Sequence, residues 1–238
     1  MAIRWRLLPA AMVALLFLVN ACVNEPTAAG TGSRLSAARL LAVDPVSLKL
    51  DPTAGNFPPP DFLRQRGNGP YSQAQWTNKV ALEGKFSVLL AKTVDFASCY
   101  TETPQNGCMA FAAVIVTGVE GMMIKDLGDI GFSVSGSCGA GSPRFNLYYD
   151  TDGDGQADGV AFYGCAANVS GMPATGWTSM SMSAVAPDFC YTFPSDPCTL
   201  LTPGSTVVEL SVLVDELGVW HIDRVQAAGS TTGEPNGT

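Results

Sequence analysis

The chain has 238 residues, of which 13 are lysine or arginine and 21 are aspartate or glutamate, so its formal net charge is −8. Loss of Arg4 and Arg6 with the first 21 residues would take the charge from −8 to −10, and the remaining basic residues form no stripe. Because nucleic-acid binding needs clustered lysine and arginine, this composition excludes a nucleic-acid partner.

The first 21 residues have the pattern of a secretory signal peptide. Arg4 and Arg6 precede an apolar run from Leu7 to Val19, which only Pro9 interrupts, and the small residue Ala21 follows. A positive segment, a short apolar segment and a small-residue exit are the three parts of such a signal. The run is too short to cross a bilayer, which takes about 20 apolar residues. We therefore expect export with cleavage rather than a retained transmembrane helix.

The exit of this signal, Val19-Asn20-Ala21-Cys22, resembles the lipobox of bacterial lipoproteins. The resemblance implies that Cys22 carries lipid and becomes the first residue of a protein anchored in the cell envelope, at the outer membrane or the cell surface. Two or more acyl chains would anchor it stably, whereas one chain binds a membrane only marginally. Cleavage after a Val-x-Ala pattern would leave the same residues, so a freely secreted protein is the alternative.

Residues 22–72 have the composition of a disordered tether. They include the small-residue run from Thr27 to Ser33 and the Pro58–Pro60 run, which is stiff and extended. We expect a spacer that holds a domain spanning 73–228 away from the membrane. The last residues, 229–238, are small and polar, and we expect them to form a flexible tail.

The domain 73–228 has the pattern of an all-β protein, because short apolar runs are separated by glycine, proline, asparagine and aspartate. Leu210, Val212 and Val214 alternate with their neighbours at the period of two that is typical of a half-buried strand. No segment has helical periodicity of similar strength. The predicted strands are Trp76–Leu82, Lys85–Ala91, Met109–Val116, Gly131–Ser137, Arg144–Tyr149, Gly159–Tyr163, Thr178–Ala184, Val207–Asp215 and Val219–Ala227.

The chain has seven cysteines, and an odd number in an exported protein leaves one to explain. Lipidation of Cys22 accounts for one and leaves six to form disulfides. A metal cluster would need Cys-x-x-Cys spacing, which is absent. Six cysteines permit 15 pairings. Proximity in the sequence favours the pairs Cys99–Cys108, Cys138–Cys165 and Cys190–Cys198.

One motif, between the strands predicted at 144–149 and 159–163, has the spacing of a calcium-binding loop. Carboxylates at positions one, three and five can converge on one hard cation, while a glycine at position six allows the turn and a carbonyl at position seven adds a ligand. The expected ligands are Asp150, Asp152, Asp154, Gln156 through its carbonyl group, and Asp158.

Position twelve of this loop is Ala161 rather than the glutamate of an EF-hand, and strands rather than helices flank it. The loop therefore resembles the strand-flanked calcium loops of integrin-type propellers and thrombospondin repeats, in which an aspartate at position nine completes the ligand shell. The resemblance implies that Asp158 has this role.

The charge distribution supports a structural calcium ion as cofactor. Residues 145–223 contain no lysine or arginine but ten acidic residues. A cation would relieve the repulsion among the four loop carboxylates, and extracellular modules often bind calcium with a Kd of about 10⁻⁴ to 10⁻³ M. A solvated acidic hairpin tip without metal is the alternative.

Catalytic candidates are weak, and we assign no catalytic residue. His221 is the only histidine, and it lies in a predicted strand beside Trp220 with no serine or cysteine partner close to it in the sequence. Several carboxylates could supply the pair that a glycosidase needs, but nothing in the sequence pairs them. These carboxylates are Glu83, Asp95, Glu102, Asp215 and Glu216.

The sequence from Cys138 onward resembles secreted jelly-roll domains similar to carbohydrate-binding modules. The resemblance depends on Ser142–Asn146, Cys165, Gly176-Trp177, Val212–Glu216 and the final strand Val219–Ala227. It implies a jelly-roll-like antiparallel β-sandwich, a structural calcium ion and a sugar held by exposed aromatic side chains. The aromatic residues that it implicates are Tyr148, Tyr149, Tyr163, Trp177 and Trp220.

The function that we expect is a calcium-stabilised, lipid-anchored surface binding or adhesion module, with a glycan as its expected ligand. Each of the implicated aromatics could instead belong to the core, where aromatic side chains bury large areas. A secreted glycosidase-like hydrolase and a purely structural envelope lipoprotein are the alternatives. The oligomeric state is not indicated by the sequence.

Overall fold

In the computed structural model, the described residues form β-strands, two short 3-10 segments and the loops that connect them. No helix within its described part is long and apolar enough to span a membrane. The signal peptide, Cys22 and the first half of the predicted tether lie outside the described residues. These residues are 46–56, 71–94, 110–139, 141–193 and 201–235.

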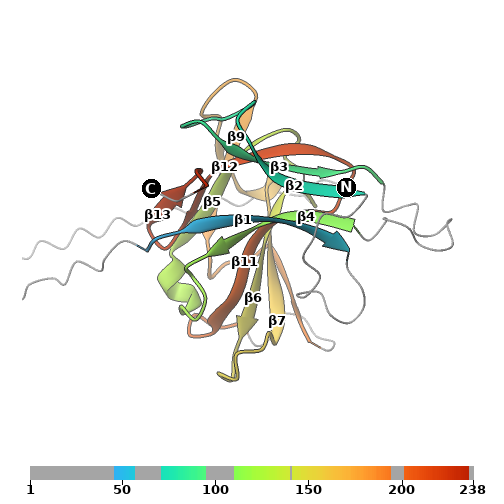
Figure 1. Cartoon of the computed structure of the whole chain (residues 1–238). Coiled ribbons are helices and arrows are strands. Elements are labelled where there is room, and N and C mark those ends of the chain that lie inside the picture. Colours follow the sequence, from blue (N-terminus) through green and yellow to red (C-terminus); the bar gives the residue numbers. More distant parts are fainter. Residues whose placement is uncertain (1–45, 57–70, 95–109, 140, 194–200, 236–238) are drawn as a thin grey trace, which may run out of the picture. The chain divides into compact units, whose positions relative to one another are not determined.

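The described chain folds into two antiparallel sheets, and the expected all-β, jelly-roll-like sandwich is confirmed (Figure 1). The first sheet has six strands in spatial order: β1 (Lys49–Asn56), β4 (Ala110–Thr117), β11 (Thr206–Val214), β6 (Arg144–Asp150), β7 (Gly159–Gly164) and β10 (Phe189–Thr192).

The second sheet has seven strands. Its path in spatial order is β2 (Ser72–Thr77), β3 (Ser87–Lys92), β12 (Gly218–Ala227), β5 (Asp129–Ser135), β9 (Trp177–Ser183) and β8 (Val169–Gly171). The seventh strand, β13 (Ser230–Thr232), pairs with β12. Helical structure in the described residues is limited to the 3-10 segments η2 (Ile124–Leu127) and η3 (Ala166–Asn168).

The core forms where the inward side chains of the two sheets meet. In β11, Leu210, Val212 and Val214 are all fully buried, as the period of two predicts. Phe132 of β5 packs edge-on against Phe145 of β6 with ring centroids 5.2 Å apart, so this aromatic pair joins the sheets. A fully buried side chain of this size stabilises a fold by roughly 1.5–3 kcal/mol.

The strand prediction is confirmed for the long apolar strands β3, β4, β5, β6, β7, β9, β11 and β12, with shifts of a few residues at their ends. β2 begins at Ser72, four residues before the predicted start, because Ser72, Ala74 and the partly buried Trp76 alternate toward the interior. The segment predicted to continue this strand instead turns toward β3.

Four strands were not predicted. β1 lies inside the segment 22–72 that we expected to be a tether, and it pairs with β4 along its whole length. Its polar sequence conceals the burial of Leu50 and Ala54 against the core. β13 lies inside the expected tail, where Thr232 is buried. The other two, β8 and β10, have only three and four residues.

Candidate functional site

The outer face of the six-stranded sheet carries polar side chains on β11 and aromatic side chains on β7 and β10. Strand side chains alternate between faces, so the residues between the inward Phe145, Leu147 and Tyr149 of β6 point outward. The register aligns these outward residues in rows across β11, β6, β7 and β10. One row is Ser211, Asn146, Phe162 and Phe189, and the next is Glu209, Tyr148, Val160 and Tyr191.

Aromatic side chains gather at the β10 end of these rows. We call Phe162, Phe189, Tyr191 and Phe193 the aromatic strip. Phe162 and Phe189 stack with centroids 5.9 Å apart and ring planes 21° apart. The ring centroids of Tyr191 and Phe193 are 6.1 Å apart. Phe189 is 58% exposed and Tyr191 is 41% exposed, so the strip presents ring surface to solvent.

The sequence carried a signal for this strip that we did not use. Phe189, Tyr191 and Phe193 occur at every second position, and Cys190 between the first two is fully buried. A cysteine that points inward forces its neighbours in a strand to point outward. Because β10 is so short, its alternation alone did not predict a strand.

The aromatic residues that the sequence implicated lie elsewhere. Tyr149, Tyr163 and Trp220 are fully buried in the core, so the expectation that they meet a ligand is wrong in this structure. Tyr149 shares a 3.2 Å hydrogen bond with Thr192, and burial raises the pKa of Tyr163 well above its ordinary value. Trp220 donates from Nε1 to the Ser137 carbonyl oxygen at 2.8 Å.

The remaining two, Tyr148 and Trp177, are 5% and 6% exposed, too little for a sugar-stacking surface. Tyr148 points outward from the middle of the sheet. Burial raises its pKa to about 12, and the nearby Glu209 carboxylate adds to this effect. Tyr148 therefore remains protonated across the physiological range.

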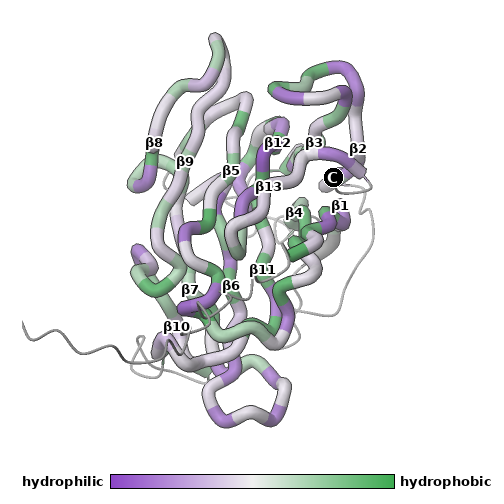
Figure 2. Tube along the Cα trace, turned by 90° about the vertical axis from the view of Figure 1, so that its left-hand side faces the viewer, coloured by the Kyte–Doolittle hydropathy of each residue, from purple (hydrophilic) through white to green (hydrophobic). Residues whose placement is uncertain are grey.

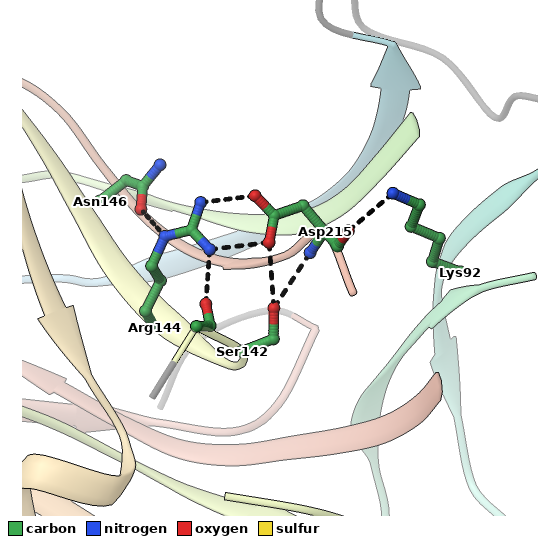
Figure 3. Close-up of polar contacts among 6 residues, drawn as sticks. Lys92, Ser142, Arg144, Asn146 and Asp215 are labelled. Atoms are coloured by element: carbon green, nitrogen blue, oxygen red, sulfur yellow. Dashed lines mark hydrogen bonds and ion pairs between the residues drawn. The ribbon is translucent and has the colours of Figure 1, made fainter. Parts of the chain in front are cut away.

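An ion pair lies beside Phe162, in the row of the sheet that joins Leu213, Arg144 and Gly164. Figure 3 shows this pair, which Arg144 and Asp215 form. Arg144 at the start of β6 binds Asp215 with both ends of its guanidinium group: Nη2 to Oδ2 at 2.7 Å and Nη1 to Oδ1 at 2.8 Å. Its Nε donates to Asn146 Oδ1 at 3.0 Å. The guanidinium carbon lies 5.5 Å from the centroid of the Phe162 ring, within cation–π range.

Asp215 also connects the two sheets. Ser142 donates from Oγ to Asp215 Oδ1 at 3.1 Å, and Lys92 of β3 donates from Nζ to the Asp215 carbonyl oxygen at 2.6 Å. Burial by itself would raise the pKa of Asp215, but the hydrogen bonds and charge of Arg144 lower it below its ordinary value. Asp215 is therefore a structural anion and not a proton donor at neutral pH.

The predicted calcium loop connects β6 to β7 and projects as a hydrophilic turn (Figure 2). Asp150, Asp152 and Asp158 each bring one oxygen within 4.8 Å of the others. The Asp154 carboxylate is outside this group. It accepts the backbone and side-chain N–H groups of Gln156 at 2.7 Å and 3.2 Å.

Backbone donors hold the loop in shape. The Asp150 carboxylate accepts N–H groups from Asp152, Gly153 and Gly155 at 3.0, 2.7 and 2.8 Å. These bonds, that of Gly153 foremost, lower the pKa of Asp150. Asp158 Oδ2 accepts the backbone N–H of Thr151 at 2.7 Å, which closes the loop. The resulting oxygens are of the type that calcium prefers.

This loop adjoins the aromatic strip. The Phe193 N–H donates to the Asp158 carbonyl oxygen at 2.6 Å, and the backbone N–H of Asp158 donates to the Tyr149 carbonyl oxygen at 2.8 Å. At the other end, exposed Asp188 precedes Phe189, and its Oδ2 accepts the Gly164 N–H at 2.8 Å. The strip therefore has carboxylates at both ends.

The candidate catalytic groups do not form a reactive site among the described residues. Glu83 Oε1 lies 3.3 Å from Arg224 Nη1. Both residues line a cavity of about 720 Å³, together with Asp223 and Glu234. Asp223 is fully buried, and burial raises its pKa against the opposing effect of three backbone N–H donors. It anchors the β2–β3 connection, because Leu82 and Glu83 both donate to its Oδ2.

The other described catalytic candidates do not form a pair of carboxylates or a nucleophile–base pair suited to catalysis. His221 lies on the outer face of the seven-stranded sheet, 3.4 Å from the Ser87 hydroxyl, and burial lowers its pKa. Glu216 lies beside Gly141. Asp95 and Glu102 lie outside the described residues.

The central disulfide prediction is confirmed, since Cys138 and Cys165 are bonded. Cys190 is also disulfide-bonded, and its expected partner Cys198 lies outside the described residues. Cys99 and Cys108 are outside them as well.

Comparisons with solved structures give distant likenesses. One is to the enzymatically active domain of tailspike protein 4 from bacteriophage CBA120, with a TM-score of 0.38 and 12% identity over 75% of this chain and 19% of that one. Another is to the C-terminal family 22 carbohydrate-binding module of Clostridium thermocellum, with a TM-score of 0.31 and 16% identity over 77% of this chain and 87% of that one.

This chain thus spans about a fifth of the length of the phage protein. No family model and no curated protein matches the sequence.

Proposed function

We propose that the protein is a surface binding module that holds a glycan on the aromatic strip. The observation that carries this proposal is the stacked pair of the half-buried Phe162 and the exposed Phe189, which Tyr191 and Phe193 extend along the edge of the sheet. An exposed apolar group of this kind on a folded protein is typical of an interaction site.

The chemistry of the strip suits a sugar. The C–H faces of a pyranose ring pack on flat aromatic rings such as that of Phe189. The ring of Phe162 is braced by Phe189 on one side and by Arg144 through its cation–π contact. Little ordering of side chains is then needed on binding, which preserves affinity.

Removal of the exposed rings tests this proposal. The double substitution Phe189→Ala with Tyr191→Ala is expected to weaken binding to the best glycan of an array at least tenfold, since each stacked ring contributes on the order of 1 kcal/mol. Isothermal titration against that glycan measures the loss. Val219→Ala is the control, because Val219 is 59% exposed on the other sheet. An array without a reproducible signal, or equal binding by the double variant, would contradict the proposal.

Calcium in the Asp150–Asp158 loop is the second part of the proposal. The convergence of three aspartate oxygens supports it. With a Kd of about 3 × 10⁻⁴ M, about 10 mM calcium should stabilise the fold by about 2 kcal/mol. Asp152→Asn should remove this gain, whereas Asp126→Asn in η2 should keep it. Thermal unfolding with calcium and with chelator makes the measurement.

Asp152 is the better target than Asp150, because Asp150 also organises the backbone of the loop. A melting temperature that calcium leaves unchanged would show that the loop is an acidic tip without metal.

Export and anchoring through Cys22 complete the proposal. The Cys138–Cys165 disulfide supports an oxidising compartment. Cys22→Ala is expected to abolish fatty-acid labelling and to move the protein from the membrane fraction to the soluble fraction, because the acyl chains would be lost. If labelling and fractionation stay unchanged, the protein is not anchored at this cysteine.

A further inference from the structure

Acidic residues lie at both ends of the aromatic strip, and no lysine or arginine is close to them in the sequence between residues 145 and 223. Asp188 is exposed beside Phe189, and the Asp150–Asp158 loop meets Phe193 through the Asp158 carbonyl group. From residue 145 to residue 223 the chain contains no lysine or arginine. The strip therefore lies in a negative electrostatic field.

Within the described ranges, the basic side chain that contacts the strip, Arg144, is already paired. Arg144 is 14% exposed, and both of its terminal nitrogens bind the Asp215 carboxylate at 2.7–2.8 Å. Its Nε is taken by Asn146. Its Nη1 also donates to the Gly141 carbonyl oxygen, so most donors of the guanidinium group are already used and its charge is balanced by Asp215.

A bound calcium ion would not reverse the field. The loop has four carboxylates, those of Asp150, Asp152, Asp154 and Asp158. Four negative charges and one divalent cation leave a net charge of −2 (−4 + 2) at this end of the strip, while Asp188 keeps its charge at the other end. Exposed aromatic faces themselves attract cations, at roughly 0.5–1 kcal/mol per contact.

We propose that the ligand class of this site is a glycan with unsubstituted, protonated amino groups, such as a glucosamine oligomer. The inference rests on the proposed function and specifies its ligand. Pyranose rings stack on Phe189 and Tyr191, and their ammonium groups face the carboxylates of Asp188 and of the Asp150–Asp158 loop. N-acetylated oligomers lose the positive charge, and uronic-acid oligomers reverse it.

The experiment titrates the full chain, with calcium present, with three probes of equal length: a glucosamine hexamer, its fully N-acetylated form and a hexauronate. Near pH 6, where the amines are charged, the glucosamine hexamer is expected to bind at least tenfold tighter than its acetylated form. Its affinity should fall as salt is added, because salt screens exposed charges. The hexauronate should not bind.

A substitution at Asp188 tests whether its charge contributes to binding of the glucosamine hexamer, because asparagine has nearly the same shape as aspartate but no charge. Asp188→Asn keeps the oxygen that accepts the Gly164 N–H, and it should weaken binding of the glucosamine hexamer by roughly threefold at low salt. Asp126→Asn, an exposed acid in η2, should change nothing. Circular dichroism confirms that both variants fold.

The outcomes distinguish the inference from the proposal beneath it. Equal affinity for the free and acetylated hexamers, or preference for the acetylated hexamer or the hexauronate, would overturn the inference and leave the glycan site standing. Failure of all three hexamers would overturn the inference, and a glycan array without a reproducible signal would overturn the proposed function as well. Binding of a lysine-rich peptide in place of any saccharide would likewise overturn both and assign the strip to protein recognition.

Discussion

Asp215→Ala is expected to lower the free energy of unfolding by about 3 kcal/mol. Arg144 is 14% exposed, and without Asp215 its guanidinium charge would stay largely buried with no anion beside it. Removal of one partner from such a pair lowers the free energy of unfolding by more than the intact pair contributes to it, because the other charge remains desolvated. Urea unfolding of both proteins measures the difference. Asp126→Ala, which removes an exposed acid, should shift the midpoint by far less.

The pH dependence gives a second measurement of the same interaction. The pKa of Asp215 is lower in the folded protein than its ordinary value, so its ionisation stabilises the fold above that ordinary value. This stabilisation is lost as the pH falls through the lowered pKa. The difference in the free energy of unfolding between the wild type and Asp215→Asn should therefore become smaller as the pH falls below the ordinary pKa of aspartate. A gap that stays constant down to acid unfolding would show that Asp215 acts without its charge.

The double substitution Cys138→Ala with Cys165→Ala is expected to cost about 3.5 kcal/mol. The two cysteines are 27 residues apart, and a cross-link across such a loop restricts the unfolded chain by about this amount on the chain-entropy model. Cys165 is fully buried in the core, so a small packing loss adds to the entropic effect. Guanidinium unfolding under non-reducing conditions makes the comparison.

Peptide mapping provides the control for this experiment. Non-reducing digestion of the wild type should release the peptides with Cys138 and Cys165 as one species, which the double variant lacks. Unchanged stability in a variant whose mapping proves the loss of the bond would contradict the prediction.

The sandwich could be predicted wherever strands are long and bury one face. Leu210, Val212 and Val214 alternate over enough residues for the period of two to be clear, and they are fully buried. β1 and β10 could not be found in the same way. β1 contains Asp51 and Pro52 and depends on pairing with β4, a contact that local sequence does not encode.

The candidate site was predictable only in part. The spacing of Asp150, Asp152 and Asp158 sufficed to locate the acidic loop, because its geometry is local. The aromatic residues required knowledge of which face each one occupies. Tyr149 and Tyr163 share the sequence pattern of exposed aromatics but point inward, whereas Phe189 points outward beside Phe162. A one-residue difference in strand phase decides between core and surface.

The placement of β11 and β12 determines when the domain can assemble. β11 lies between β4 and β6, and β12 lies between β3 and β5, so the two longest strands of the described chain are interior to their sheets and come late in the sequence. Until they have been synthesised, β4 and β6 lack their shared neighbour, and so do β3 and β5. A chain emerging from the ribosome would keep those edges unpaired until nearly all of it had been made. Delayed closure of this kind implies a slow final folding step dominated by long-range pairing, and it would keep the polypeptide unfolded long enough for the export that we propose.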